Sequence, residues 1–285
     1  MQYTDLQMNH KEIVHGNGKQ LAYVRTNDWK DDIILFFHGF CGSKEYFPDI
    51  DSAACIVSFD RPGIGESEVE QYYSMEGFLT NVYEVLKEHH VNSVRMIGHS
   101  AGGYYAQLFA QMYPDVVKSL SLVSSMVPLN CPATKGIVKG QWKFIVLLSL
   151  RFKWFSRFYF KKMASGINKG YEKQLASNMK RLLPVERQFM EGNHDMIKTA
   201  VLNAVANDGA GVCYDAYALC QKRDDLTISQ NIPVYVWHGS EDTTTPLSFV
   251  EFFRSRYSVK AEHIIDHVGH MLYLPYWRII TEEVL

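Results

Sequence analysis

A serine flanked by small residues is the first candidate for chemistry. Residues 94–103 read VRMIGHSAGG, so Gly98 and Gly102 stand two positions on either side of Ser100. Strand-forming residues precede this serine and a helix-forming run follows it. Such glycines let neighbouring backbone approach a sharp strand-to-helix turn, and the helix directs its N-terminal N–H groups toward negative charge that develops at the serine. The pattern predicts a nucleophilic Ser100.

A serine hydroxyl needs a base to accept its proton and an acid to orient that base. His270 follows the last predicted strand, and Asp242 follows the strand before it. We therefore predict a catalytic triad of Ser100, His270 and Asp242. Glu241 and Asp266 are the competing acids, but each is expected to point away from the site.

The elements that must position these residues alternate between strand and helix. Apolar or strand-forming runs cover residues 20–25, 33–37, 55–59, 94–97, 120–123, 234–237 and 263–265. Helical runs cover residues 75–88, 102–112 and 247–257. This alternation predicts an α/β fold, with a mostly parallel sheet and helices on both faces.

The alternation stops after about residue 126 and resumes near residue 232. The intervening residues are predicted to be helical, and between Cys131 and Met190 they carry thirteen Lys and Arg against two Glu. We interpret residues 127–231 as a helical cap inserted into a core domain formed by residues 1–126 and 232–285.

Composition excludes several other classes of protein. The chain has 285 residues, 47% of them hydrophobic and 21% charged, with a formal net charge of -2. This balance argues against a dedicated nucleic-acid binder. Five scattered cysteines without CxxC spacing favour reduced thiols over a disulfide framework or a zinc site. The first nineteen residues lack the apolar run of an export signal, and residues 144–150 are too short to span a membrane, so a cytoplasmic location is expected.

Four motifs together resemble the α/β-hydrolase superfamily, in the arrangement with a cap that is common among its esterases, lipases and carbon–carbon bond hydrolases. They are HGF at residues 38–40, DRPGIGES at residues 60–67, the glycine-flanked serine, and Asp242 with His270. The resemblance covers about residues 18–130 and 230–285. It implies an α/β-hydrolase fold and an oxyanion hole formed by the backbone N–H groups of Phe40 and Ala101. Serine in place of aspartate at residue 100 disfavours dehalogenase and epoxide hydrolase chemistry.

Substrate contacts are expected from four residues, two within these motifs and two in the cap. Phe40 is expected to wall the acyl site, and His99 is expected to support the site rather than act as the base. Trp142 and Phe155 come from the aromatic cap segment at residues 140–163. That segment either lines an apolar pocket with a solvated basic face, or makes peripheral contact with anionic lipid.

The expected activity is that of a serine hydrolase that cleaves a small carboxylic ester or thioester with an apolar part, without a metal or cofactor. Two alternatives stay open. One is a carbon–carbon bond hydrolase that acts on diketones with the same triad, and the other is a ligand-sensing relative with slow turnover. The sequence predicts neither the natural substrate nor the oligomeric state.

Overall fold

In the part of the chain that the structure describes, the sheet that carries the predicted site has eight strands. The computed structural model describes residues 10–16, 18–48, 54–180 and 182–285, so residues 1–9, part of the stretch examined for an export signal, lie outside the described residues. The strands are β1 (His10–Gly16), β2 (Lys19–Arg25), β3 (Asp32–Phe37), β4 (Ile56–Phe59), β5 (Ser93–His99), β6 (Val117–Val123), β7 (Val234–Gly239) and β8 (Val259–Ile265). Their order is β1-β2-β4-β3-β5-β6-β7-β8. All neighbours from β4 to β8 are parallel, whereas β1, β2 and β4 pair antiparallel.

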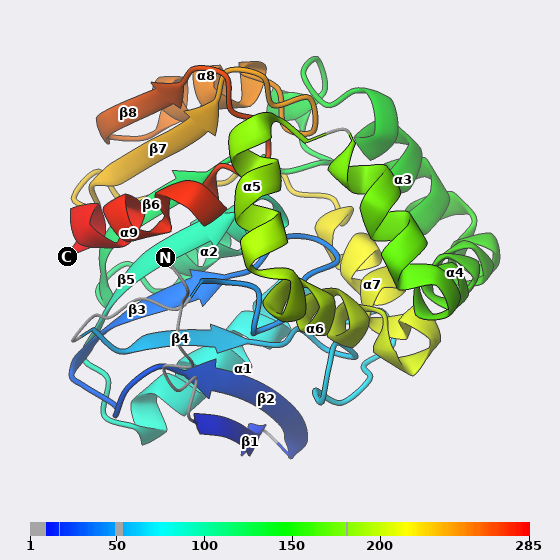
Figure 1. Cartoon of the computed structure of the whole chain (residues 1–285). Helices are drawn as coiled ribbons and strands as arrows, with labels where there is room; N and C mark the ends of the chain where they lie inside the picture. Colours follow the sequence, from blue (N-terminus) through cyan, green and yellow to red (C-terminus); the bar gives the residue numbers. More distant parts are fainter. Residues whose placement is uncertain (1–9, 17, 49–53, 181) are drawn as a thin grey trace.

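Helices cover both faces of this sheet. The helices of the core are α1 (Met75–Glu88), α2 (Ala101–Met112), α8 (Ser248–Arg256) and α9 (Tyr273–Val284). In Figure 1, α9 lies across the near face of the sheet, and α1 and α2 lie behind it. The predicted α/β fold with a mostly parallel sheet is therefore confirmed.

The alternating residues of a buried strand explain the two layers of core. On β3, Ile33, Leu35 and Phe37 pack into one cluster, which includes α1, α2 and α8. Ile34 and Phe36 point to the opposite face and pack with α9. Because successive strand side chains alternate between faces, a strand covered on both sides is apolar throughout.

The helix α1 shows how local sequence sets the bounds of an element. Ser74 accepts a hydrogen bond from the Gly77 N–H at 3.0 Å, which caps the helix N-terminus. A stripe of buried side chains then faces the sheet: Met75, Phe78, Leu79, Val82, Val85 and Leu86. The observed bounds are those predicted from the sequence.

Between β6 and β7 the described chain forms helices and no strand. After the short 3₁₀ helix η1 (Pro132–Thr134) come α3 (Gly140–Arg151), α4 (Lys153–Met179), α5 (Pro184–Gly192), α6 (His194–Ala204) and α7 (Ala206–Leu219). In Figure 1 these helices lie beyond the carboxyl ends of the parallel strands. They fall within residues 127–231, the segment interpreted as a cap.

Candidate active site

Ser100 lies in the turn between β5 and α2. Its φ of 53° and ψ of -121° are unusual for a residue other than glycine and mark a strained turn. The turn requires close backbone packing, because a Cβ on Gly98 would lie 2.5 Å from the Cα of Gly103 and one on Gly102 would collide with the Phe37 carbonyl. The two flanking glycines therefore let α2 begin directly beside the ends of β3 and β5.

The loops after β7 and β8 bring the other two predicted residues to this turn. The Ser100 hydroxyl donates to His270 Nε2 at 2.9 Å, and His270 Nδ1–H donates to Asp242 Oδ2 at 2.8 Å. Ser100 is 2% exposed and Asp242 is 7% exposed. The structure thus brings together all three residues predicted for the triad, in hydrogen-bonded order.

Three hydrogen-bond donors from the neighbouring threonines hold the Asp242 carboxylate. The Thr244 and Thr245 N–H groups donate to Oδ1 at 2.8 and 2.9 Å, and the Thr245 hydroxyl donates to Oδ2 at 2.7 Å. Burial by itself raises the pKa of Asp242, but the charge of His270 and these hydrogen bonds outweigh it and bring the pKa well below its ordinary value. The carboxylate therefore stays ionised and fixed as an acceptor for His270.

The competing acids lie elsewhere. Glu241 pairs with His267 at 3.2 Å, and the side chains of both are substantially exposed. Asp266 is exposed at the end of β8. Neither carboxylate has a hydrogen bond to His270 among the described residues.

His99 is buried behind the site. Its ring lies 4.1 Å from the ring of Tyr273, and its Nε2–H donates to the His270 carbonyl at 3.0 Å. Burial, together with the charge of His270, lowers the pKa of His99 to about 3, so its imidazole is neutral at ordinary pH. At 3% exposure, His99 supports the main chain of His270, and its assignment as a substrate contact does not fit this position.

Three aromatic rings from the core and the cap meet above the turn that follows β3. Phe40 makes edge contacts with Trp142 of α3 and Phe160 of α4, each with ring centroids 6.2 Å apart. Trp142 also donates from Nε1 to the Thr244 carbonyl at 2.7 Å, beside the Asp242 loop. Phe40 and Trp142 are thus brought together, as their common assignment to the substrate contacts requires.

Phe155 does not join this cluster. Its side chain is 46% exposed and its described ring contact is with Phe158, also exposed. The helical period explains the difference, because Ser156 and Phe160 occupy the buried face of α4 while residue 155 lies on another face. Phe155 therefore lies apart from the rings of Phe40 and Trp142, and its assignment to the substrate contacts does not fit this position.

A buried arginine fixes the backbone of the predicted oxyanion loop. Arg61 donates from its two terminal nitrogens to the carbonyls of His38 and Gly39, both at 2.8 Å. The Gly39 carbonyl and the Phe40 N–H are opposite ends of one trans peptide. By holding that carbonyl, Arg61 also sets the direction of the N–H that is predicted to bind the oxyanion.

The partner of Arg61 comes from the cap. Asp215 of α7 forms an ion pair with Arg61 at 3.0 Å. It also accepts hydrogen bonds from the hydroxyls of Tyr105 at 2.7 Å and Tyr73 at 3.1 Å. Burial raises the pKa of Asp215, against the opposing effect of the Arg61 charge. This ion pair connects a cap helix to the oxyanion loop.

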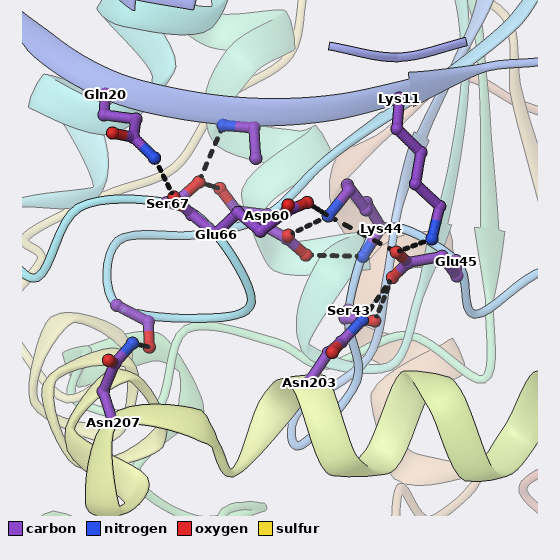
Figure 2. A network of polar contacts seen from close by, with 12 residues as sticks. Lys11, Gln20, Ser43, Lys44, Glu45, Asp60, Glu66, Ser67, Asn203 and Asn207 are labelled. Carbon is purple, nitrogen blue, oxygen red and sulfur yellow. Dashed lines mark hydrogen bonds and ion pairs between the residues drawn. The ribbon is translucent and has the colours of Figure 1, made fainter. Parts of the chain in front are cut away.

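A second buried charge network lies beside that loop (Figure 2). The Lys44 ammonium, which is fully buried, donates to Asp60 at 2.7 Å and to Glu66 at 3.1 Å. Glu45 accepts from Ser43 at 2.7 Å and from Asn203 of α6 at 3.2 Å, and pairs with Lys11 at 3.2 Å. The network therefore ties the DRPGIGES loop, the loop after β3 and the cap together.

One more carboxylate connects the cap to the histidine loop. Glu186 of α5 is 1% exposed. It accepts from the Met271 N–H at 2.7 Å and from the Leu183 N–H at its own helix N-terminus at 3.1 Å. Its carboxylate therefore holds the residue directly after His270.

In the sequence, Arg61 falls within the DRPGIGES motif, and Asp215 and Glu186 fall within residues 127–231. For Asp215 the signal is a charged residue flanked by apolar or small ones, in GAGVCYDAYAL of α7. Arg61 and Glu186 each have a charged neighbour, Asp60 and Arg187, and carry no such signal. That signal identifies burial but not the partner, because the partners lie more than 80 residues away in the chain.

In the residues that the structure describes, no three His, Cys, Asp or Glu side chains form a group that could hold a metal ion. The five cysteines are all unpaired. None of the helices in the described ranges has the length and apolar character that crossing a membrane demands.

Comparison with protein families agrees with this geometry. The family described as "alpha/beta hydrolase fold" matches residues 32–275. The chain belongs to the α/β hydrolase fold family. The matched range includes Ser100, Asp242 and His270 and the whole of residues 127–231.

Individual relatives share a low fraction of identical residues with this chain. Lipase 1 of Psychrobacter immobilis is 30% identical over 121 residues, which are 40% of this chain and 38% of the lipase. Ethanol acetyltransferase 1 of Cyberlindnera fabianii is 24% identical over 42% of this chain and 38% of its own. The chain thus spans less than half of the length of each. Among α/β hydrolase folds of known structure, an esterase from Exiguobacterium antarcticum superposes with a TM-score of 0.67 at 16% identity, covering 95% of this chain and 97% of its own.

Proposed function

We propose that the protein is a serine hydrolase that cleaves a small carboxylic ester or thioester with an apolar acyl or alcohol part. The observation that carries this proposal is the continuous hydrogen-bonded series from Ser100 through His270 to Asp242, with distances of 2.9 and 2.8 Å. That series ends on an ionised, buried carboxylate, which is the arrangement that activates a serine hydroxyl.

The reaction has two halves. Ser100 Oγ attacks the substrate carbonyl while His270 Nε2 takes its proton, and the C–O or C–S bond breaks as His270 returns that proton to the departing alcohol or thiol. A water molecule then attacks the acyl-enzyme with His270 as base, releasing the carboxylic acid and restoring the Ser100 hydroxyl. Asp242 holds the imidazole and stabilises its positive charge in both halves.

The N–H groups of Phe40 and Ala101 are proposed to bind the oxyanion in each half. Ala101 begins α2, and the first N–H groups of a helix have no acceptor inside it. Phe40 follows the peptide carbonyl that Arg61 holds. Each such donor is worth about 2.7–4 kcal/mol in the barrier.

The apolar rings of Phe40, Trp142 and Phe160 support a substrate with an apolar part. They meet beside the Gly39–Phe40 peptide and lie partly or wholly out of water. Burying an apolar group of the substrate against such rings favours binding in proportion to the area removed from water. This support concerns the class of substrate and not its identity.

The test is turnover of p-nitrophenyl acetate and butyrate, combined with labelling by a fluorophosphonate and mapping of the labelled residue. We expect steady turnover, stoichiometric label on Ser100, and a loss in kcat of about 10⁴–10⁶ in Ser100→Ala. The matched control is Ser255→Ala, an exposed serine of α8, which should leave turnover unchanged.

Other outcomes contradict the proposal in different ways. Label on another serine, with Ser100→Ala still active, rejects the nucleophile. Turnover of diketones but of no ester or thioester, lost in Ser100→Ala, identifies a carbon–carbon bond hydrolase. One turnover followed by a stable acyl-enzyme identifies a ligand-sensing relative.

A further inference from the structure

An apolar surface lies on the outer side of α3 and α4. Seven of the fourteen large exposed hydrophobic side chains in the described chain fall between residues 144 and 159, with exposed fractions from 40% to 80%. They are Phe144, Leu147, Phe152, Trp154, Phe155, Phe158 and Tyr159. We call these seven residues the cap patch.

Ring contacts show that members of the cap patch adjoin one another. Phe144 of α3 makes an edge contact with Tyr159 of α4 at 6.3 Å. On α4, Phe158 stacks on Trp154 at 6.2 Å and contacts Phe155 at 6.3 Å. Exposed apolar side chains are ordinary when scattered, but a contiguous patch marks an interaction site.

The cap patch is not the packing face of these helices. On α4 the packing face carries Ser156, Phe160, Ala164 and Ile167, all buried. On α3 it carries Trp142, Leu148 and Ser149. Each helix is therefore apolar on two faces, one against the rest of the protein and one toward solvent.

Basic residues predominate in the segment that carries the cap patch, and Asp208, an acidic residue that reaches α4, is paired with Lys161 at 2.8 Å. No Asp or Glu occurs between residues 116 and 171, and the segment from Cys131 to Met190 has a net charge of +11, leaving the rest of the chain at -13. Lys143, Arg151 and Lys162 have no carboxylate of a described residue within ion-pair distance, and Lys162 lies over the Phe158 ring at 5.6 Å. Their charges are available to an outside partner.

We propose that the cap patch docks on an anionic phospholipid bilayer. Aromatic rings favour the boundary between headgroups and acyl chains, and each Lys or Arg near an anionic surface contributes about 1 kcal/mol. A second copy of this chain fits less well, because face-to-face pairing would bring two unneutralised basic surfaces together. The acidic remainder of the molecule would be repelled by the same bilayer, which leaves the cap as the side that faces it.

Docking in this way would place the candidate site near the bilayer. Trp142 and Phe160, on the inner faces of the same two helices, contact Phe40 of the site. The docking inference rests on exposure and charge and does not require the proposed hydrolase activity. Its test is therefore a binding measurement.

The experiment is co-sedimentation with vesicles of phosphatidylcholine alone and of phosphatidylcholine with phosphatidylglycerol. The wild-type protein should bind the anionic vesicles at low salt and release at high salt, as screening shortens the Debye length from about 10 Å to about 3 Å. Trp154, 80% exposed, should shift its fluorescence emission to the blue on binding.

Two variants and a control separate the contributions. Lys143→Gln/Arg151→Gln/Lys162→Gln should weaken binding to anionic vesicles roughly a hundredfold. Trp154→Ser/Phe158→Ser should weaken it at least tenfold while keeping its salt dependence. The matched control is Arg278→Gln/Ile279→Ser on α9, an exposed pair of the same kinds, which should bind as the wild-type protein does.

Four results would overturn the proposal. These are no binding of the wild-type protein to anionic vesicles at low salt, equal binding to both vesicle types, unchanged binding by both cap patch variants, and a dimer in sedimentation velocity that Trp154→Ser/Phe158→Ser dissociates. Because none of them uses turnover, loss of the docking inference and loss of the proposed activity are distinguishable.

Discussion

Asp242 accepts four hydrogen bonds within a buried loop. Three come from Thr244 and Thr245, so the carboxylate is fixed whether or not His270 is present. This explains how one side chain both stays charged and selects the tautomer of its neighbour, with the proton on His270 Nδ1 and the lone pair of Nε2 facing Ser100.

We predict that Asp242→Asn lowers kcat by about 10⁴ while the protein still folds, because an amide N–H facing His270 Nδ1 favours the wrong tautomer. Glu241→Gln, one residue away and paired on the surface with His267, should change kcat less than twofold. The measurement is steady-state turnover of p-nitrophenyl acetate by both variants. A crippled Glu241→Gln beside a mild Asp242→Asn would assign the role to the other carboxylate.

Arg61 should act on turnover through the peptide that it holds. Arg61→Lys replaces a planar fork with a single ammonium, which cannot reach both the His38 and Gly39 carbonyls in the same way. We expect kcat to fall about tenfold to a hundredfold, within the range found for oxyanion donors, with KM nearly unchanged. Steady-state kinetics with a thermal unfolding curve tests this, and an unchanged kcat in a folded variant would refute it.

The sequence alone was enough to predict which residues meet at Ser100, because the serine turn and the two loops all follow parallel strands, whose carboxyl ends share one edge of the sheet. It was not enough to predict what the side chains of His99 and Phe155 contact. The environment of a side chain depends on which face of the strand or helix it occupies and on what packs there. His99 ends β5 with its ring against Tyr273 of α9, a helix that the sequence reading did not include.

At the scale of elements, the sequence analysis omits two elements that the structure contains, β1 and α9. The strand β1 has the sequence HKEIVHG, which is mostly polar, and among the described strands it pairs only with β2, at the edge of the sheet. The helix α9 has Pro275 in its first turn, where proline is tolerated because the N–H needs no partner. Its buried stripe of Tyr273, Trp277, Ile280 and Val284 has helical spacing that a longer window would have detected.

The helix α5 should affect the active site through Glu186. Glu186→Ala leaves the half-buried N–H groups of Met271 and Leu183 without an acceptor, and a donor left unsatisfied out of water costs up to roughly 1–3 kcal/mol. We expect a lower melting temperature together with a lower kcat, because the residue after His270 loses its anchor. KM should change little.

The matched control for this prediction is Glu191→Ala, an exposed glutamate of the same helix. It should match the wild-type protein in both melting temperature and kcat. If Glu186→Ala lowers the melting temperature but leaves kcat intact at a temperature where it is folded, Glu186 has a structural role only.

At the scale of the whole molecule, buried charged side chains connect the cap to the core. Glu45 lies where Lys44 and Lys11 of the core meet Asn203 of α6 (Figure 2). Burial raises the pKa of Glu45, but the Lys44 charge, the Ser43 hydrogen bond and the Lys11 charge outweigh it and lower the pKa to about 2. The folded protein therefore resists protonation of Glu45 more than the unfolded chain does.

This shift predicts a specific loss of stability in acid. Since the pKa is lowered on folding, the contribution is fully present above about pH 4.5 and disappears as pH falls toward about 2. Its size is on the order of 3 kcal/mol. Urea unfolding at pH 7 and pH 3 should show a smaller acid-induced loss for Glu45→Gln than for the wild-type protein, and equal losses would contradict the role of Glu45.

The last strand of the sheet, β8, has a further consequence for how the protein behaves at high concentration. Among the described strands it is terminal and pairs only with β7, so its other edge faces no described strand and can accept an extended chain. Lys260 and Glu262 place charges along this strand, and Glu262 is held there by Arg254 at 2.7 Å. Charged residues on an edge strand oppose edge-to-edge aggregation. Replacing both with Val or Thr would favour β-strand addition between molecules, and insoluble protein would form without any change in the catalytic loops.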